Sequence, residues 1–304
     1  MQRIVIFTDD PGWHGSRLRE AFACDGYDCV CVSLTECRLV VDTGFPALFI
    51  PGFEADLPDA VFVRGVPGGS LEEVVFYLDI LHALELSRIP VYNNTRAIER
   101  SVDKGMASFL LQKAGVFTPA TWVLRDRETA LAIAERELLA GRQLLSKPLF
   151  GSQGEGIRRI EKMTDLLWLT SSHGIYYLQR FIDCEGSGFS DWRVFVVNGQ
   201  VIAVMRRRGL FWLNNVARGA QCEAAEPTPQ MNKLAIRATA ALQMNYAGVD
   251  IIRDKEGAMS VIEVNSIPAW KGLETVNDVD IAEILVQDLL VGAGLKQVIK
   301  KALR

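Results

Sequence analysis

Three oxygen-bearing side chains lie close together in the last third of the chain, within segments that are otherwise apolar. Asp250 occurs in a Gly-Val-Asp-Ile-Ile segment, and Glu263 and Asn265 lie two residues apart in a Val-Ile-Glu-Val-Asn segment. Because side chains alternate between the two faces of a strand, Glu263 and Asn265 project from one face. If residues 254–257 form a hairpin turn, Asp250 lies opposite residue 261 or 263, and either pairing places it on that face.

Such a cluster of oxygen donors is able to hold a hard cation. Carboxylates this close repel one another and are costly to bury unless a cation neutralises them. Mg²⁺ suits the cluster because it takes few protein oxygens and shares its other positions with phosphates and water. The alternative interpretation is that Asp250 and Glu263 lie at strand ends and face solvent.

A lysine followed by a glycine-rich loop forms a second candidate site. The apolar segment Leu144–Lys147 ends in the lysine, and Gly151, Gly154 and Gly156 follow it. Glycine allows backbone N–H groups to approach an anion closely, and lysine supplies a positive charge. The segment is neither a Walker A loop nor a dinucleotide-binding fingerprint. By itself it fits a phosphate clamp and a flexible hairpin equally well.

A third group of residues is basic. Arg206, Arg207 and Arg208 lie at the end of a predicted strand, and Asp191 and Arg193 lie at the start of the strand before it. Alternation turns Arg207 away from its two neighbours, toward a cleft that it would share with Arg193. Guanidinium groups bind carboxylates and phosphates through a bidentate fork. A solvated basic rim is the alternative.

The elements that position these residues change in type along the chain. In the first ninety residues, strands are expected at 4–8, 28–34, 47–50 and 60–64, and helices at 16–23 and 70–88. Ser70 and Glu73 have the spacing of a capping box at the start of the second helix. Strands that alternate with helices predict an open, mostly parallel α/β sheet.

The remainder of the chain has a pattern typical of α+β structure. Helices are expected at 101–114, 127–140, 229–244 and 280–303, and strands at 175–182, 192–197, 201–206, 247–253 and 259–265. Asn198 and Gly199 form a two-residue hairpin turn between two of these strands. The pattern therefore predicts antiparallel sheet in this part of the chain.

Composition excludes several classes of protein. The chain has 304 residues, of which 49% are apolar and 23% charged, and its net charge is −4. No run of like charges is present, which argues against a broad nucleic-acid-binding face. No apolar stretch reaches the length of a membrane span, and Met1–Phe7 is too short for a signal peptide. The six cysteines form no Cys-x-x-Cys pair, so we expect a cytoplasmic protein with free thiols.

Taken in order, these segments resemble the ATP-grasp ligases and, within them, the RimK-like glutamate ligases. The resemblance covers about residues 94–283. The matching segments are Ser101–Lys104, Ser146–Gly156, Leu178–Ile182, Asp191–Arg193, Asn215–Gly219, Gly248–Asp250 and Glu263–Pro268. It implies an ATP-grasp fold with an N-terminal α/β domain (1–93), a central and lid subdomain (94–182) and a C-terminal subdomain (183–304).

The resemblance implies that ATP lies between the two α+β subdomains, with residues 151–156 as a mobile lid. The backbone of residues 180–182 would contact the adenine edge, and Asp191 would hold the ribose. Many relatives have Glu where this chain has Arg180, so an acidic contact to adenine would be lost here. The residues implied to bind ATP are Lys104, Lys147, Gly151, Ser152, Gln153, Gly154, Gly156, Gln179, Arg180, Phe181, Ile182 and Asp191.

The resemblance also implies a reaction, in which a carboxylate attacks the γ-phosphate of ATP and an amine then attacks the acyl phosphate. The implied ligands of one or two Mg²⁺ ions, with Mn²⁺ as the alternative, are Asp250, Glu263 and Asn265. The residues expected to stabilise the acyl phosphate and its tetrahedral adduct are Arg207, Asn215 and Arg218. The residues expected to bind the substrates are Arg64, Arg193 and Ser266.

The segments Val63–Ser70 and Asn93–Arg100 look most like the tetrahydromethanopterin-type glutamate ligases. The resemblance therefore implies that L-glutamate is added to a small coenzyme carboxylate, in a protein that forms homo-oligomers. The side chains expected to contact a pterin, unless they serve only in packing or lie at the surface, are Trp13, His14, Arg64 and Trp212. One alternative is a glutamate ligase acting on a protein C-terminal tail, and another is a non-catalytic nucleotide-binding module.

Overall fold

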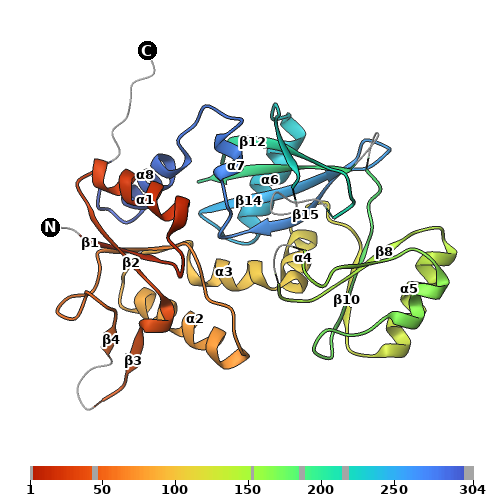
Figure 1. Ribbon diagram of the computed structural model, residues 1–304, viewed down its shortest axis with the longest axis horizontal. Coiled ribbons are helices and arrows are strands. Elements are labelled where there is room, and N and C mark those ends of the chain that lie inside the picture. The colour runs from red at the N-terminus through yellow and green to blue at the C-terminus, as the bar shows by residue number, and fades with distance from the viewer. Residues whose placement is uncertain (1–2, 43–46, 152–153, 185–188, 214–218, 298–304) are drawn as a thin grey trace.

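The computed structural model describes residues 3–42, 47–151, 154–184, 189–213 and 219–297 (Figure 1). The chain begins with a parallel four-stranded sheet in the order β2-β1-β5-β6. Its strands are β1 (Arg3–Phe7), β2 (Asp28–Val32), β5 (Ala60–Val63) and β6 (Val91–Tyr92). The open parallel sheet expected from the alternation of strands and helices is thus confirmed. A short antiparallel ribbon of β3 (Arg38–Val40) and β4 (Ala47–Phe49) projects beside it.

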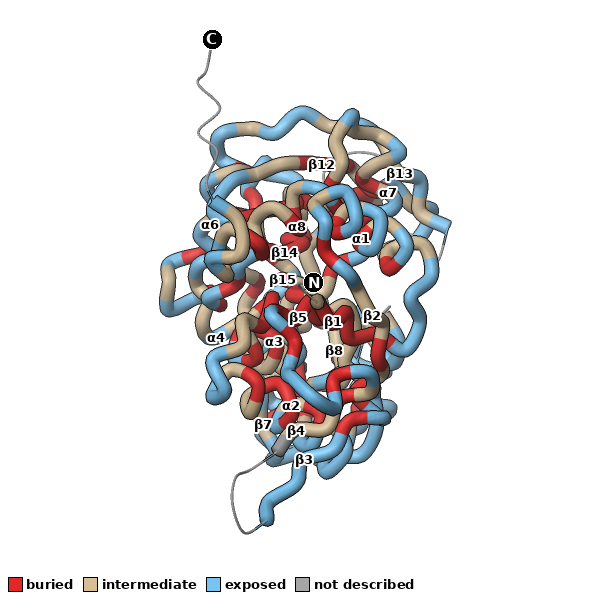
Figure 2. Tube along the Cα trace, turned by 90° about the vertical axis from the view of Figure 1, so that its left-hand side faces the viewer, coloured by how far each residue is buried: buried red, intermediate tan, exposed pale blue. Residues whose placement is uncertain are grey.

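Two helices cover opposite faces of this sheet. Because successive strand residues face opposite sides, Ile4 packs against α1 (Gly12–Cys24), whereas Val5 packs against α2 (Leu71–Leu86). The capping box predicted at Ser70 and Glu73 is present at the start of α2. Buried residues run along β1 and β5 at the centre of Figure 2.

The middle of the chain forms an antiparallel sheet in the order β7-β10-β8-β9. Its strands are β7 (Thr121–Leu124), β8 (Leu144–Lys147), β9 (Arg158–Ile160) and β10 (Tyr176–Arg180). The helix α5 (Arg127–Leu139) packs on one face of this sheet through Ala130 and Ala134, and the turn η2 (Met163–Trp168) lies beside that helix. The opposite face carries Lys147 and Gln179.

One helix expected in this region was predicted wrongly. In place of a single helix over residues 101–114, the structure has α3 (Thr95–Val102) and α4 (Lys104–Lys113). The Asp103 side chain between them accepts hydrogen bonds from the N–H groups of Gly105 (2.8 Å) and Met106 (3.0 Å). An aspartate that caps a new helix in this way ends the preceding one.

The last sheet is antiparallel, in the order β13-β12-β11-β14-β15. Its strands are β11 (Phe189–Val197), β12 (Gln200–Gly209), β13 (Gln221–Ala224), β14 (Tyr246–Arg253) and β15 (Met259–Asn265). Asn198 (φ 48°) and Gly199 (φ 71°) form the predicted turn between β11 and β12. The helix α6 (Pro229–Ala241) packs on one face, and α7 (Lys271–Glu274) and α8 (Ile281–Gly292) pack on the other.

The N-terminal and C-terminal sheets share one hydrophobic core. Ile4 and Leu18 of the N-terminal part belong to the same buried cluster as Phe195, Trp270 and Leu285. The helices α1 and α8 lie side by side across this junction (Figure 1). The carboxyl ends of β1 and β5 are therefore held at a fixed place relative to the C-terminal sheet.

The helix expected over residues 280–303 ends at Gly292. Gly294 has φ 70°, and the N–H groups of Leu295 and Lys296 both donate to the Leu290 carbonyl, which is a glycine-terminated helix end. Lys296 forms an ion pair with Asp25 instead of lying in the last turn of a long helix. Among the residues with described positions, no helix is both long and apolar enough to cross a bilayer.

Candidate active site

The three oxygen-bearing side chains singled out in the sequence lie on one face of the C-terminal sheet. Asp250 on β14 pairs directly with Glu263 on β15, and Gly248 pairs with Asn265. Of the two pairings that the sequence left open for Asp250, residue 261 or 263, the structure has residue 263. Asp250 is buried (3% exposed), Asn265 is half-buried and Glu263 is exposed. Among the described residues, no side chain or backbone group forms a hydrogen bond or ion pair with the Glu263 carboxylate.

Asp250 belongs to a buried network of two carboxylates and two guanidinium groups. Arg207 on β12 donates from Nε and Nη2 to the two Asp191 oxygens, both at 2.7 Å, and its Nη2 lies 2.8 Å from Asp250 Oδ2. Arg193 on β11 donates from Nε to Asp250 Oδ1 and from Nη2 to Asp250 Oδ2, the latter at 2.9 Å. The strand register explains the network, since Asp191 pairs with Arg207 and Arg193 pairs with Asp250.

Burial and charge pairing act in opposite directions on this network. Burial raises the pKa of Asp191 although the Arg207 charge lowers it. Burial opposes the carboxylate form of Asp250, but the charges of Arg193 and Arg207 lower its pKa below the ordinary value. Burial likewise disfavours the Arg207 cation, yet Asp250 and Asp191 raise its pKa. Two positive and two negative groups compensate one another, which is the condition under which charges are tolerated in a protein interior.

Arg207 points as the sequence alternation predicted. It turns toward Arg193 and Asp250, whereas Arg206 lies over the Trp192 ring at 5.6 Å. Both Asp191 oxygens accept hydrogen bonds from Arg207, so the ribose contact expected for Asp191 stays a prediction. The Asp250 carboxylate offers about four lone pairs and three are used, which leaves one on Oδ1.

Two lysines from different elements lie near Glu263. Lys147, the last residue of β8, donates from Nζ to Gln179 Oε1 at 2.6 Å. Lys104, the first residue of α4, donates from Nζ to the Gly151 carbonyl at 2.6 Å. Burial lowers the pKa of Lys147 to about 8 although the Glu263 charge raises it, and Lys104 lowers it further. Burial also lowers the pKa of Lys104, and Glu263 again acts in the opposite direction.

A hydrogen-bonded chain of neutral side chains fixes Lys147. Gln179 is 2% exposed, and its Nε2 donates to Thr121 Oγ1 (3.1 Å) and to the Tyr177 hydroxyl (3.2 Å). The Tyr177 hydroxyl lies 3.0 Å from Ser108 Oγ on α4. Sequence reasoning missed Thr121 and Tyr177, although alternation along residues 176–180 already places Tyr177 and Gln179 on one face.

Arg180 has a structural partner on the opposite face. Its Nη2 lies 2.8 Å from Glu137 Oε2, and Arg142 Nε lies 2.7 Å from the same oxygen. Burial disfavours the Glu137 carboxylate, but hydrogen bonds from Arg142 and Arg180 bring its pKa below the ordinary value. The N–H groups of Arg180 and Phe181 already donate to the carbonyls of Ala120 and Gln143. The adenine contact expected for the backbone of residues 180–182 stays a prediction, and these two N–H groups are already used.

The other predicted site residues have varied surroundings. Gly151, Gly154 and Gly156 all have positive φ (131°, 75° and 70°), a conformation that favours glycine. Ser266 is buried, and its Oγ accepts from Ser101 Oγ at 2.7 Å. Arg64 at the end of β5 donates to the Ile267 carbonyl. Four predicted residues lie outside the described part of the chain, namely Ser152, Gln153, Asn215 and Arg218.

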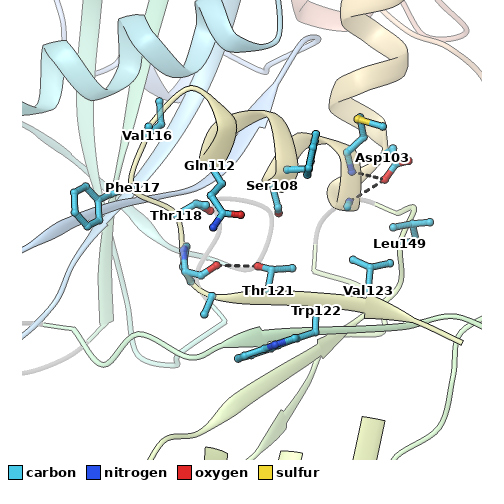
Figure 3. Close-up of a pocket in the computed structure, with 16 residues that line it drawn as sticks. Asp103, Ser108, Gln112, Val116, Phe117, Thr118, Thr121, Trp122, Val123 and Leu149 are labelled. Carbon is cyan, nitrogen blue, oxygen red and sulfur yellow. Dashed lines mark hydrogen bonds between the residues drawn. The ribbon is translucent and has the colours of Figure 1, made fainter. Parts of the chain in front are cut away.

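A groove of about 790 Å³ lies between α4 and β7 (Figure 3). Its residues Ser108 and Thr121 belong to the hydrogen-bonded chain that reaches Lys147. Ser108, Gln112 and Thr121 point into it. Phe109 and Phe117 also line it, with 59% and 73% of their surfaces exposed. None of the predicted site residues lines this groove. Its volume is in the range of small-molecule sites, roughly 300–1,000 Å³.

Known proteins resemble this chain in sequence and in structure. Residues 101–289 match a family model described as a RimK-like ATP-grasp domain. A tetrahydromethanopterin:alpha-L-glutamate ligase of Methanococcus maripaludis is 34% identical over 235 residues, which cover 75% of this chain and 78% of that one. A protein of the same name from Methanocaldococcus jannaschii is 33% identical over 88% of this chain and 92% of its own length.

Among solved structures, the ATP-grasp ligase PsnB complexed with a minimal precursor matches with a TM-score of 0.72 at 21% identity, over 96% of this chain and 99% of that chain. PsnB complexed with the minimal precursor, Mg and ADP matches with a TM-score of 0.70 at 21% identity, over 96% and 98% of the two chains.

Proposed function

The chain belongs to the RimK-like ATP-grasp family, and on that premise we propose that it joins L-glutamate to a carboxylate of a small coenzyme, such as a tetrahydromethanopterin-type pterin, and converts ATP to ADP and phosphate. Its architecture is the ATP-grasp fold expected from the sequence. The names of the two methanogen relatives support glutamate as the amine and a pterin coenzyme as the acceptor.

The observation that carries this proposal is that two lysines from different elements lie within electrostatic range of one carboxylate. Lys104 and Lys147 come from α4 and β8, and the negative charge of Glu263 on β15 raises the pKa of both, against the effect of burial. Burial makes each lysine cation costly in the free protein, so an incoming polyphosphate replaces lost hydration with direct charge pairing. The Gln179 hydrogen bond holds Lys147 in place before the nucleotide arrives.

The residues on the β14–β15 face fit a magnesium ion. Glu263 forms no hydrogen bond or ion pair with the described residues, Asn265 shares its face, and Asp250 retains one lone pair on Oδ1. No group of three or more His, Cys, Asp or Glu side chains suited to a metal occurs in the described part of the chain, so the other coordination positions fall to phosphate oxygens and water. When bound there, Mg²⁺ offsets the charge that develops on the phosphates. Mn²⁺ takes the same ligands.

The chemistry divides between phosphoryl transfer and amide formation. A carboxylate oxygen of the acceptor attacks the γ-phosphorus, the bond to the bridging oxygen breaks, and ADP leaves. The amine of glutamate then attacks the acyl carbon, loses a proton and releases phosphate. Arg193 and Arg207 fix the orientation of Asp250. The contact of Arg207 with the acyl phosphate stays a prediction.

Mass spectrometry on reactions with ATP, Mg²⁺, isotope-labelled L-glutamate and fractionated small-molecule extract tests the proposal. We expect a labelled small acceptor together with stoichiometric ADP. Lys147→Ala should abolish the label, whereas Lys113→Ala, at the far end of α4, should retain it. Absence of label on any small molecule, with ADP still released for other amino acids, would contradict glutamate as the amine.

A peptide acceptor is the second candidate, and the groove between α4 and β7 is the observation that favours it. Its lining exposes Phe109 and Phe117, which suit an extended chain with apolar side chains. Label found on a protein or peptide and on no small molecule would replace the coenzyme by a protein tail. Absence of both ADP release and label under all conditions would favour a non-catalytic nucleotide-binding module.

A further inference from the structure

At the junction of the N-terminal and C-terminal sheets, two neighbouring hydrogen-bond donors are buried with no partner in the described part of the chain. They are Nε of Arg64 and Nε1 of Trp270. The Arg64 guanidinium carbon lies 5.2 Å from the centroid of the Trp270 ring, so the two side chains are in contact. Buried donors in proteins are nearly always paired, and two unpaired donors on adjacent side chains indicate a missing acceptor.

This pair lies where ligands bind in open parallel sheets. Arg64 directly follows β5, and His14, which packs against Trp270, lies in the first turn of α1 after β1. In α/β sheets the carboxyl ends of the strands form the edge that receives ligands. Trp270 lies five residues beyond Asn265, and Arg64 Nη1 donates to the Ile267 carbonyl at 3.3 Å. The two donors are therefore joined through a short loop to the strand that carries Glu263.

The electrostatics of the junction favour an anion. Arg64 and Lys271 carry positive charge there, and no carboxylate of the described residues forms an ion pair with either of them. His14 Nε2 accepts a hydrogen bond from the N–H of Trp270 at 3.1 Å. Burial, together with Arg64 and Lys271, lowers the pKa of His14 to about 4, so the ring is neutral and adds no competing cation. The missing acceptor for Arg64 Nε and Trp270 Nε1 is therefore a compact anion with acceptor oxygens.

We propose that Arg64 and Trp270 form a carboxylate-binding subsite, which holds a carboxylate that does not react while the reacting centre of the same substrate lies toward β15. Carboxylate is the fitting anion because an arginine edge and an indole N–H supply two directed donors to its two oxygens. The identity of the substrate rests on the proposed function, in which glutamate and an acidic acceptor each bring such a carboxylate. The binding of a carboxylate does not rest on it.

Paired substitutions test the subsite. Trp270→Phe removes the N–H and keeps an aromatic ring, and Arg64→Lys keeps the charge and removes Nε. Trp168→Phe, at a side chain that is 74% exposed, is the matched control. We expect the KM of one carboxylate substrate to rise about 10- to 100-fold in both variants, with the KM of ATP changed less than about twofold. The substrate whose KM rises, glutamate or acceptor, identifies the source of the carboxylate.

A binding measurement separates recognition from mere structural support. Calorimetric titration with L-glutamate, L-glutamine and L-isoglutamine, in the presence of a non-hydrolysable ATP analogue, reports which carboxylate is recognised. If glutamate occupies the subsite, the wild type should bind one amide at least tenfold more weakly than glutamate, and Arg64→Lys and Trp270→Phe should lose that discrimination. If the acceptor occupies it, only the acceptor titration should weaken. The subsite proposal is overturned if both variants bind every ligand, including the ATP analogue, equally more weakly than the wild type. It is also overturned if both variants fold and their affinities for all ligands are unchanged.

A further arm distinguishes failure of the subsite from failure of the proposed function. Glutarate binds through carboxylates alone and takes no part in amide formation. If the wild type ligates glutamate and both variants keep their affinities for glutamate, acceptor and glutarate, the subsite is wrong and the function stands. If the wild type ligates no glutamate but binds glutarate, and Arg64→Gln loses that binding, the subsite stands and the function is wrong.

Discussion

Replacing Asn93 with alanine should lower the melting temperature of the protein by about 6 °C. Asn93 is fully buried (0% exposed) directly after β6, and its side-chain amide makes four hydrogen bonds to backbone groups. Nδ2 donates to the carbonyls of Tyr246 (2.7 Å) and Ser266 (2.8 Å). Oδ1 accepts from the N–H groups of Asn245 (2.7 Å) and Tyr246 (3.2 Å). One side chain thus joins the end of the N-terminal sheet to β14 and to the residue after β15.

The magnitude follows from these contacts. A buried hydrogen bond contributes about 1 kcal/mol, so removing four costs about 4 kcal/mol. A chain of this length has an unfolding entropy of about 0.6 kcal/mol/K, which converts the loss to about 6 °C. Asn94 is the matched control because it is half-buried, caps α3 through the Ala97 N–H and makes one bond to the Gln243 carbonyl. Its replacement by alanine should cost about 2 °C.

Differential scanning calorimetry of the wild type, Asn93→Ala and Asn94→Ala provides the comparison. Because Ser266 follows the proposed metal ligand Asn265, Asn93→Ala should also raise the Mg²⁺ concentration needed for half-maximal ADP release, and Asn94→Ala should not. A melting temperature for Asn93→Ala within about 2 °C of that of Asn94→Ala would refute the reasoning. The four hydrogen bonds would then contribute no more than a helix cap and a single bond.

Three further substitutions probe the site. Burial lowers the pKa of Lys147 to about 8, so the Lys147 cation is lost as the pH rises through that value. The affinity for ATP, measured by calorimetry, should therefore fall about tenfold from pH 7 to pH 9. Lys147→Arg stays charged and should remove most of that dependence; an unchanged pH profile would assign it to another group. Glu263→Gln should raise the Mg²⁺ concentration needed for half-maximal activity about tenfold or more. It should shift the melting temperature by less than about 1 °C, because Glu263 is exposed and forms no ion pair with a described residue. A normal Mg²⁺ titration would remove Glu263 from the metal site. Gly248→Ala would place Cβ 2.7 Å from Pro268 Cβ and 3.1 Å from Arg193 Cδ. Denaturant unfolding should therefore report a loss of about 1–3 kcal/mol in the free energy of unfolding. Wild-type stability would show that the loop containing Pro268 moves to accept the added methyl group.

The sequence by itself determined the features that depend on neighbouring residues. Alternation placed Glu263 and Asn265 on one face and turned Arg207 toward Arg193. A four-residue turn placed Asp250 on the face of Glu263, although it left residue 261 or 263 open as the partner. Turn and capping chemistry placed the hairpin at Asn198 and the start of α2. These features are local because strand period, turn geometry and helix caps are set within a few residues.

Only the tertiary structure decided which partners the charged and amide groups find. The pairing of Asp191 with Arg207 and of Arg193 with Asp250 follows from a strand order in which β11 lies between β12 and β14. Sequence spacing could not show that order, since β11 and β14 are separated by an entire helix. The same holds for Asn93, whose partners lie about 150 residues away. Burial makes such distant contacts decisive, because a charge or an amide in the interior must find its partner wherever the fold brings one.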